Sequence, residues 1–366
     1  MLKNNTTLII DGNWLMMSRL GMMRDKFSSE LTDEQLQSAT NDLVDFLAQS
    51  VNKIINFFES NIDNIIMVQD GGSWRKKIRK PKLYKEAYKG NRVKDIGMNW
   101  DYIWKSLSIF CQNFKNLDIS CFREDDCEGD DWCWYWSKTL NKNGTNVIIW
   151  SSDRDLQQLV RYNKNKTWTV WYNDRAGLIC HENLAPKEDL LEDMLSLEME
   201  CSSFEHLKTD MINKMIDVHF INPLDIAMEK VICGDSGDNI KAIIRVQNGE
   251  RIARVSEKEW GLVKESYEDF IDLEDFKKTA PDIIRDLKNL KRFAENKDSG
   301  KDIYQMFLFN MRLVCLDAKY IPKKIRDLMN KHKEEYLLAD LESVVNNYKV
   351  LAPTDDVQVE ELFDIF

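Results

Sequence analysis

Three short apolar runs, each followed by an aspartate, mark the first half of the chain. They read TLIID, NIIMVQD and NVIIWSSD, and their aspartates are Asp11, Asp70 and Asp153. Such runs are typical of strands buried on both faces of a sheet. Between the first two, residues 33–60 carry apolar positions at helical spacing behind a Thr32–Gln35 capping box. The alternation predicts an α/β fold with a largely parallel central sheet flanked by helices.

The second half of the chain has a different pattern. Residues 239–351 show helical periodicity without strong strand signals, which predicts a smaller, mostly α-helical C-terminal domain. The first domain would then span residues 1–238, with an acidic insertion of two helices at 187–220 to which the sequence assigns no role. Residues 352–366 form a tail after a short linker.

Charge is distributed unevenly along the chain. The net charge is −11, yet residues 75–94 contain ten Lys or Arg and only Glu86 as an acid. Most charge runs are merely solvated faces. Here Trp74, Tyr84 and Tyr88 are interleaved with the cations, an arrangement suited to stacking on unpaired bases. We therefore expect nucleic-acid contacts from Arg75, Lys76, Lys77, Arg79, Lys85 and Tyr88.

Several classes of protein are not supported by the sequence. No run of eighteen apolar residues exists, and the first residues lack the form of a signal peptide. The eight cysteines include no C-x-x-C pair, so we expect a reduced, intracellular setting without a zinc site. Phosphate-binding and dinucleotide-binding glycine motifs are also absent from the sequence.

Nine acids lie at strand ends or in two further clusters, EGDD and GDSGDN. They are Asp11, Asp70, Glu128, Asp130, Asp131, Asp153, Asp155, Asp235 and Asp238. Each cluster alone also fits a helix start, since Ser152 and Asp155 have capping-box spacing. In a parallel sheet, however, the strand ends meet at one edge, and crowded carboxylates need a cation. Ligation by oxygen alone predicts Mg²⁺ or Mn²⁺, and two such ions suit attack on a phosphodiester.

Six motifs resemble those of the 5′-nuclease (flap endonuclease) family, and within it the T-even bacteriophage enzymes. They are LIIDGN, MVQDGGSWRK, YKGNR, CEGDDWCW, WSSDRDLQQLV and ICGDSGDNI, in the family's order and spacing. The resemblance covers roughly residues 6–240 and continues more weakly in RLVCLDAKYIPKKIRDLM. It implies a PIN-like domain that cuts 5′ ends, flaps and RNA primers with two Mg²⁺ ions, or with Mn²⁺ in their place.

The resemblance also implies a role for each site residue. Asp11, Asp70, Glu128, Asp130 and Asp131 would build the first metal site, and Asp153, Asp155, Asp235 and Asp238 would build or border the second. Lys89 and Arg92 in YKGNR match the family's active-site cations and would stabilise charge on the scissile phosphate. Arg75 would contact backbone phosphate.

Residues 76–119 would form the family's arch over a single-stranded 5′ end. Trp100, Tyr102 and Trp104 would then either stack on bases or form the core face of a helix. After GDSGDN the chain departs from the family because it lacks the Gly-rich turn and has only Gly249. We therefore do not expect a potassium ion, and duplex contact falls to Lys241, Arg245, Arg251 and Arg254.

The tail ends in an apolar group on an acidic stem. Its members are Leu362, Phe363, Ile365 and Phe366. Such a peptide either docks in a sliding-clamp pocket or folds back on its own domain. A single-strand-binding protein is a second candidate partner, and no membrane contact is expected.

These observations favour a Mg²⁺-dependent 5′-to-3′ exonuclease and flap endonuclease that removes RNA primers. We expect a monomer in the cytoplasm of a phage-infected bacterium. Two alternatives stay open: a PIN-fold ribonuclease acting on single-stranded RNA, and a structure-specific binding protein with a non-catalytic site. The YKGNR motif and the complete GDSGDN motif favour the exonuclease and flap endonuclease over both alternatives.

Overall fold

The computed structural model describes residues 5–85, 87–92, 95–185, 202–248, 251–267, 270, 272–293, 295–338 and 341. The tail at 352–366, with the predicted docking peptide, lies outside the described residues, as does most of the first half of the acidic insertion.

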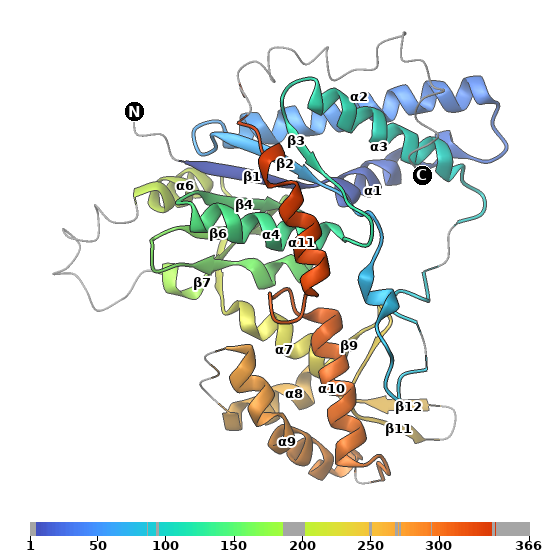
Figure 1. The fold of residues 1–366 in the computed structure, drawn as a ribbon, viewed down its shortest axis with the longest axis vertical. Helices are drawn as coiled ribbons and strands as arrows, with labels where there is room; N and C mark the ends of the chain where they lie inside the picture. The colour runs from blue at the N-terminus through green and yellow to red at the C-terminus, as the bar shows by residue number, and fades with distance from the viewer. Residues whose placement is uncertain are drawn as a thin grey trace.

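One sheet organises the upper body in Figure 1, in the order β3-β2-β1-β4-β6-β7-β8, with β5 paired to β6. The pairs β1–β2, β2–β3, β1–β4 and β4–β6 are parallel, which confirms the predicted sheet. Only β5 and β7 run antiparallel to β6. The strands are β1 Thr6–Asp11, β2 Asn64–Val68, β3 Ser120–Phe122, β4 Asn146–Trp150, β5 Arg161–Tyr162, β6 Trp168–Asn173, β7 Gly177–His181 and β8 Val218–Ile221.

Alternate residues of β1 point into different cores. Leu8 and Ile10 join a cluster with one layer of helices, whereas Ile9 joins a cluster on the opposite face. The first layer contains α1 Gly12–Met23, η1 Arg24–Phe27, α2 Asp33–Phe58 and α3 Trp100–Lys115. The second contains α4 Gly129–Lys142 and η3 Arg154–Leu159. The Thr32–Gln35 capping box predicted for α2 is confirmed.

Only part of the acidic insertion at 187–220 lies among the described residues. Its described part is one helix, α6 Ser202–Asn213, followed by β8, which pairs in parallel with β7 at the sheet edge. The strand VHFI was not predicted, whereas the predicted pair of helices extends into residues outside the described range and stays a prediction. The short helices η2 Trp74–Lys77 and η4 Glu182–Leu184 complete the upper body.

The lower body combines helices with two small antiparallel sheets (Figure 1). Its elements are α7 Pro223–Cys233, β9 Gly234–Asp235, β10 Ile240–Lys241, β11 Arg245–Asn248, β12 Arg251–Arg254, α8 Glu257–Lys264, η5 Glu265–Tyr267, α9 Leu273–Asn289, η6 Lys291–Phe293 and α10 Gly300–Val314. The β11–β12 hairpin was not predicted, although Asn248–Gly249 between two alternating runs is a hairpin signal.

The chain then returns to the sheet. In α11 Lys323–Lys331, Asn330 accepts a hydrogen bond from Tyr135 of α4 at 3.0 Å. Beyond η7 Lys333–Glu335, the Tyr336 hydroxyl accepts from Asn64 of β2 at 2.9 Å. The described segment after α10 therefore packs against the sheet, and the division of the chain at residue 238 stays a prediction. Among the described residues, no helix is long and apolar enough to cross a membrane.

Candidate active site

Four carboxylates from separate elements line one cavity at the carboxyl edge of the sheet. Asp11 ends β1, Asp70 lies two residues beyond β2, Asp130 lies in the first turn of α4, and Asp153 follows β4. The cavity measures about 510 Å³. The parallel pairing of β1 with both β2 and β4 brings these ends together. The predicted convergence thus holds for these four side chains.

Two of these four acids also act as helix caps. Asp11 accepts from the Trp14 N–H at 3.0 Å and caps α1, while Asp153 accepts from the Asp155 N–H at 2.9 Å and caps η3. Capping uses one lone pair of a carboxylate oxygen and leaves others for a cation. The cap and the ligand interpretations are therefore compatible. Asp235, by contrast, follows the end of α7 and caps no helix start.

The buried, closely spaced carboxylates of the cavity favour binding of a cation. Burial raises the pKa of Asp11 to about 7, and the charges of Asp70 and Asp153 add to this rise. Burial, followed by the charge of Asp153, also raises the pKa of Asp130. Carboxylates in this state are poorly compensated, and their oxygen donors suit a hard divalent ion such as Mg²⁺ or Mn²⁺. The carboxylate oxygens are of the type that binds such an ion. Among the described residues, however, no three Asp, Glu, His or Cys side chains are arranged as a complete metal site in this structure.

A buried network behind the cavity engages two of the predicted metal ligands, Glu128 and Asp131. Arg75 pairs with Glu128 at 2.6 Å and with Asp131 at 2.9 Å. Asp131 also accepts from the Trp74 indole at 3.0 Å and from the Glu128 N–H at 3.0 Å. Burial alone would raise the pKa of Glu128, but Arg75 and Lys89 lower it to about 2. The network thus holds Glu128 ionised at the start of α4.

The structure corrects two predicted nucleic-acid contacts. Arg75 is 3% exposed, and its Nε donates to the Leu313 carbonyl at 2.9 Å. Tyr88 is 5% exposed, and its hydroxyl donates to Asp238 at 2.9 Å. Neither side chain can reach a phosphate or a base in this arrangement. Both side chains instead hold other parts of the protein in place, because segments distant in sequence pack over them.

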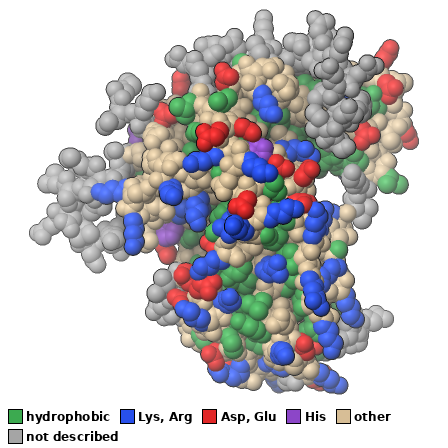
Figure 2. All heavy atoms as spheres, in the orientation of Figure 1, with side chains coloured by type: hydrophobic (Ala, Val, Ile, Leu, Met, Phe, Trp, Pro, Cys, Tyr) green, Lys and Arg blue, Asp and Glu red, His purple; other side chains and the backbone are tan. Residues whose placement is uncertain are grey.

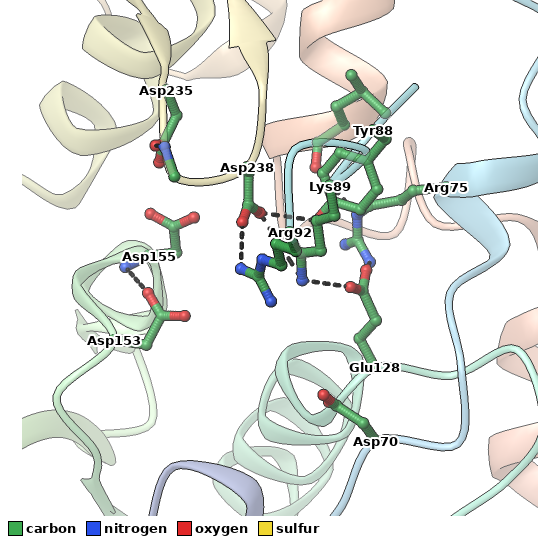
Figure 3. A network of polar contacts seen from close by, with 12 residues as sticks. Asp70, Arg75, Tyr88, Lys89, Arg92, Glu128, Asp153, Asp155, Asp235 and Asp238 are labelled. Carbon is green, nitrogen blue, oxygen red and sulfur yellow. Dashed lines mark hydrogen bonds and ion pairs between the residues drawn. The ribbon is translucent and has the colours of Figure 1, made fainter. Parts of the chain in front are cut away.

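Lys89 and Arg92 reach the carboxylates from the segment that crosses the site. Figure 3 shows both side chains between Asp238 and the Glu128 side of the site. The Lys89 ammonium lies 2.5 Å from Glu128 and 3.8 Å from Asp238, and Arg92 lies 2.5 Å from Asp238. Lys89 has a left-handed φ of 54°, a strained conformation for a non-glycine residue that is often found at functional positions.

A second group of carboxylates surrounds a lysine that the sequence analysis missed. Lys230 of α7 forms ion pairs with Asp155 and, at 2.7 Å, with Asp235. Lys230 outweighs the effect of burial and lowers the pKa of Asp235. Its position one turn before GDSGDN, on a helix leading into the motif, was the available signal. In this structure a lysine therefore neutralises the carboxylates expected to border the second metal site.

Apolar side chains, most of them aromatic, complete the lining of the carboxylate cavity. Trp14, Met17, Trp100 and Trp104 line the carboxylate cavity. The rings of Trp100 and Trp104 are stacked, with centroids 6.3 Å apart, and both also pack against the core below α3. Tyr102 instead donates to Asp33 of α2 at 3.1 Å. The core-face interpretation is thus confirmed for the two tryptophans, while stacking on bases stays a prediction.

Basic side chains gather at one edge of the molecule. In Figure 2, Lys and Arg follow the right-hand edge of the lower body, where Figure 1 places β11, β12 and the segment before α3. Lys76, Lys77, Arg79, Lys85 and Arg254 are exposed, and Lys241 and Arg245 are partly buried. Lys77 pairs with Asp126 at 2.5 Å. The side chain of Arg251 is not among those described.

The comparison that decides the family concerns the upper body. A family model described as 5′-3′ exonuclease, N-terminal resolvase-like domain, matches residues 6–188, from the start of β1 to just beyond η4. The chain belongs to this family. It is therefore a 5′-nuclease, as the motifs indicated. No curated protein is similar enough in sequence to count as a match.

Solved structures extend the likeness of this 5′-nuclease beyond residue 188. The T5 D15 protein co-crystallised with metal ions is 15% identical, with 95% of this chain and 100% of that chain covered and a TM-score of 0.53. T5 5′-exonuclease with bound zinc is 14% identical, with 95% of this chain and 100% of that chain covered and a TM-score of 0.52. A third structure is a bacteriophage T5 D15 flap endonuclease in a pseudo-enzyme–product complex with DNA and metal ions. It is 15% identical, with 95% of this chain and 99% of that chain covered and a TM-score of 0.50. At these identities the likeness shows the fold alone.

Proposed function

We propose that the protein is a divalent-metal-dependent 5′-to-3′ exonuclease and flap endonuclease. The observation that carries the proposal is the cavity that joins Asp11, Asp70, Asp130 and Asp153 with Lys89 and Arg92. Mg²⁺ is the proposed ion, with Mn²⁺ as its substitute, because the donors are all carboxylates. Two ions are proposed, the second at Asp155, Asp235 and Asp238, which would require Lys230 to move aside.

The chain's own residues would act on the scissile phosphate from two sides. When bound, a divalent ion supplies a Lewis acid and lowers the pKa of an attacking water. Lys89 and Arg92 would neutralise the negative charge that develops on the phosphate. Arg92 can bind two phosphate oxygens at once, whereas Lys89 acts as a point charge. Glu128, held ionised by Arg75, would orient Lys89 towards the cavity.

The substrate we propose is a duplex with an unpaired 5′ segment, either a DNA flap or an RNA primer. The exposed cations at the basic edge would hold the duplex through its phosphates. Trp100 and Trp104 would stack on unpaired bases, which is sequence-tolerant. A neighbouring cavity of about 710 Å³ shares Asn13, Asp70 and Trp104 with the carboxylate cavity and offers room for nucleotides on the 5′ side.

We further propose a biological setting of primer removal during lagging-strand synthesis in a phage-infected cell. Residues 1–238 would carry catalysis, residues 239–351 duplex binding, and the tail at 352–366 docking to a sliding clamp. Contact with a single-strand-binding protein belongs to the same proposal. The family resemblance supports these roles, and the exposed cations of the basic edge support duplex binding.

The testing experiment compares cleavage of a 5′-labelled flap duplex and an RNA-primer hybrid in Mg²⁺ and in EDTA. Asp153→Asn removes one cavity carboxylate and should slow single-turnover cleavage by at least about 100-fold. Asp118→Asn is the matched control, because Asp118 is exposed and its φ of 57° suits Asn equally well. Binding without cleavage in Mg²⁺ and Mn²⁺ would instead indicate the non-catalytic binding protein.

A further inference from the structure

A cavity of about 350 Å³ lies between the sheet and the lower body and shares no residue with the carboxylate cavity. Its wall combines the apolar side chains of Trp134, Leu224 and Leu316 with a set of charged groups. The cations are Lys138, Arg161 and Lys319, and the acids are Asp272 and Asp317. Pockets of this size bind small molecules in many proteins.

Arg161 is the unusual member of this wall. Its Nε donates to the Leu159 carbonyl at 3.0 Å and its Nη2 to the Ser137 hydroxyl at 3.3 Å, so both acceptors are neutral. Within the described chain, no carboxylate lies within ion-pair distance of Arg161, and Asp317 affects it only from further away. Burial lowers the pKa of the guanidinium to about 10. The side chain is partly exposed, so its charge is partly removed from water without a close counter-ion, which costs stability.

The surroundings of Arg161 favour an anion. Two helices, α7 and α9, begin at the cavity with Pro223 and Leu273, and helix N-termini carry partial positive charge. Asp272 already accepts from the N–H groups of Glu274 and Asp275, at 2.8 Å and 3.0 Å. Asp317 accepts from the Lys319 N–H at 2.8 Å. These N–H groups hold both acids in place, and within the described chain neither acid lies within ion-pair distance of Arg161.

His181 adds a hydrogen-bond donor to the same wall. Its Nδ1 accepts from the Asn183 N–H at 3.1 Å, which leaves the proton of the neutral ring on Nε2. Burial lowers the pKa of His181, so the neutral ring is the form expected at neutral pH. Lys138 and Lys319 are exposed and lie at the rim, where Lys319 also forms an ion pair with Glu274 at 3.5 Å.

We propose that this cavity binds a phosphate-bearing small molecule, with the Arg161 guanidinium as its counter-charge. The phosphate would accept from Arg161 and from the rim lysines, and Trp134, Leu224 and Leu316 would contact an organic group attached to it. Inorganic phosphate and a 5′-mononucleotide share this chemistry. The site is separate from the carboxylate cavity and does not depend on the proposed nuclease function.

The test measures binding of inorganic phosphate and of thymidine 5′-monophosphate by calorimetry in EDTA. Wild-type protein should bind at least one of them saturably, and Arg161→Met should weaken binding at least tenfold. Arg285→Met is the matched control, because Arg285 is exposed and paired with Asp282 and Asp286. Lys89→Met removes the phosphate contact proposed for the active site and should leave this binding unchanged.

The outcomes separate the ligand sources and keep the proposal open to refutation. Tighter binding of the nucleotide would identify a nucleotide site, and equal binding a phosphate site. If Arg161→Met does not fold, Lys138→Met at the exposed rim should still weaken binding at least threefold. No binding to wild type, unchanged affinity in the variants, or loss in Lys89→Met would overturn the proposal. Weakened flap-DNA binding in Arg161→Met would also overturn it, in favour of a DNA-backbone contact.

Discussion

The guanidinium of Arg75 donates to both carboxylate oxygens of Asp131, at 2.9 Å and 3.2 Å, with both side chains almost fully buried. The same guanidinium reaches Glu128 at 2.6 Å. One cation therefore holds two acids of the EGDD motif at the start of α4. Its position sets where Glu128 can meet Lys89.

Replacing Arg75 with methionine should destabilise the protein strongly. It would leave Glu128 and Asp131 buried without their cation, a loss of about 3–5 kcal/mol in the free energy of unfolding. Urea denaturation measures this change. Lys77→Met, which removes the exposed ion pair with Asp126, should cost no more than about 1 kcal/mol. Similar losses in the two variants would contradict the structural role of Arg75.

Lys89→Met should slow cleavage while sparing affinity. The Lys89 ammonium lines the carboxylate cavity, so its loss removes charge stabilisation at the phosphate and should slow single-turnover cleavage by roughly 100–1000-fold. Flap-DNA affinity, measured by fluorescence anisotropy, should fall less than tenfold because the exposed basic edge is intact. Lys301→Met, on the exposed start of α10, serves as the control. An equal loss of affinity and rate would assign Lys89 to binding alone.

Lys230→Met should make stability depend on divalent ions. Without the lysine, Asp155 and Asp235 repel each other, and we expect a loss of about 1–3 kcal/mol in EDTA. Excess Mg²⁺ should restore more stability to this variant than to wild type, because the ion can replace the missing charge. Lys264→Met, which breaks the ion pair with Asp225, should lose the same amount with and without Mg²⁺. A loss in Lys230→Met that Mg²⁺ does not reduce would count against a metal position there.

The stability of the protein should decline slightly as pH rises past the folded pKa of His332. His332 contacts Glu124 at 2.9 Å and Glu335 at 2.8 Å. Burial alone would lower the pKa of His332, but the two glutamates raise it. Because the pKa of His332 is higher in the folded than in the unfolded state, protonation of His332 stabilises the fold. This stabilisation is complete below about pH 6.5 and is lost as the pH rises through the pKa of His332 in the folded state.

The contribution of His332 should be no more than about 1 kcal/mol, since the pair is partly exposed. Unfolding free energies of wild type and His332→Gln, measured from about pH 6 to pH 9, should differ most at the acid end. Parallel pH profiles for the two proteins would show that His332 does not contribute in this way.

The local pattern of the sequence determined the elements that depend on neighbouring residues. Buried strands need short apolar runs, and helix starts need capping side chains, so β1, β2, β4 and α2 could be read directly. The parallel order of these strands then followed from their alternation with helices, and with it the shared edge of Asp11, Asp70 and Asp153. The motifs identified the family because they contain the acids that lie at this edge of the sheet.

Tertiary structure alone decided how each charge is used. Arg75 and Tyr88 looked like contacts for nucleic acid, but a long-range approach of α10 and of the GDSGDN loop buries them. Lys230 became the partner of Asp155 because α7 packs beside η3, 75 residues away in sequence. Burial and counter-charges depend on segments far apart in the chain, and no local pattern encodes them. The sequence therefore specified which charged groups the site contains, and the fold decided which of them face the cavity.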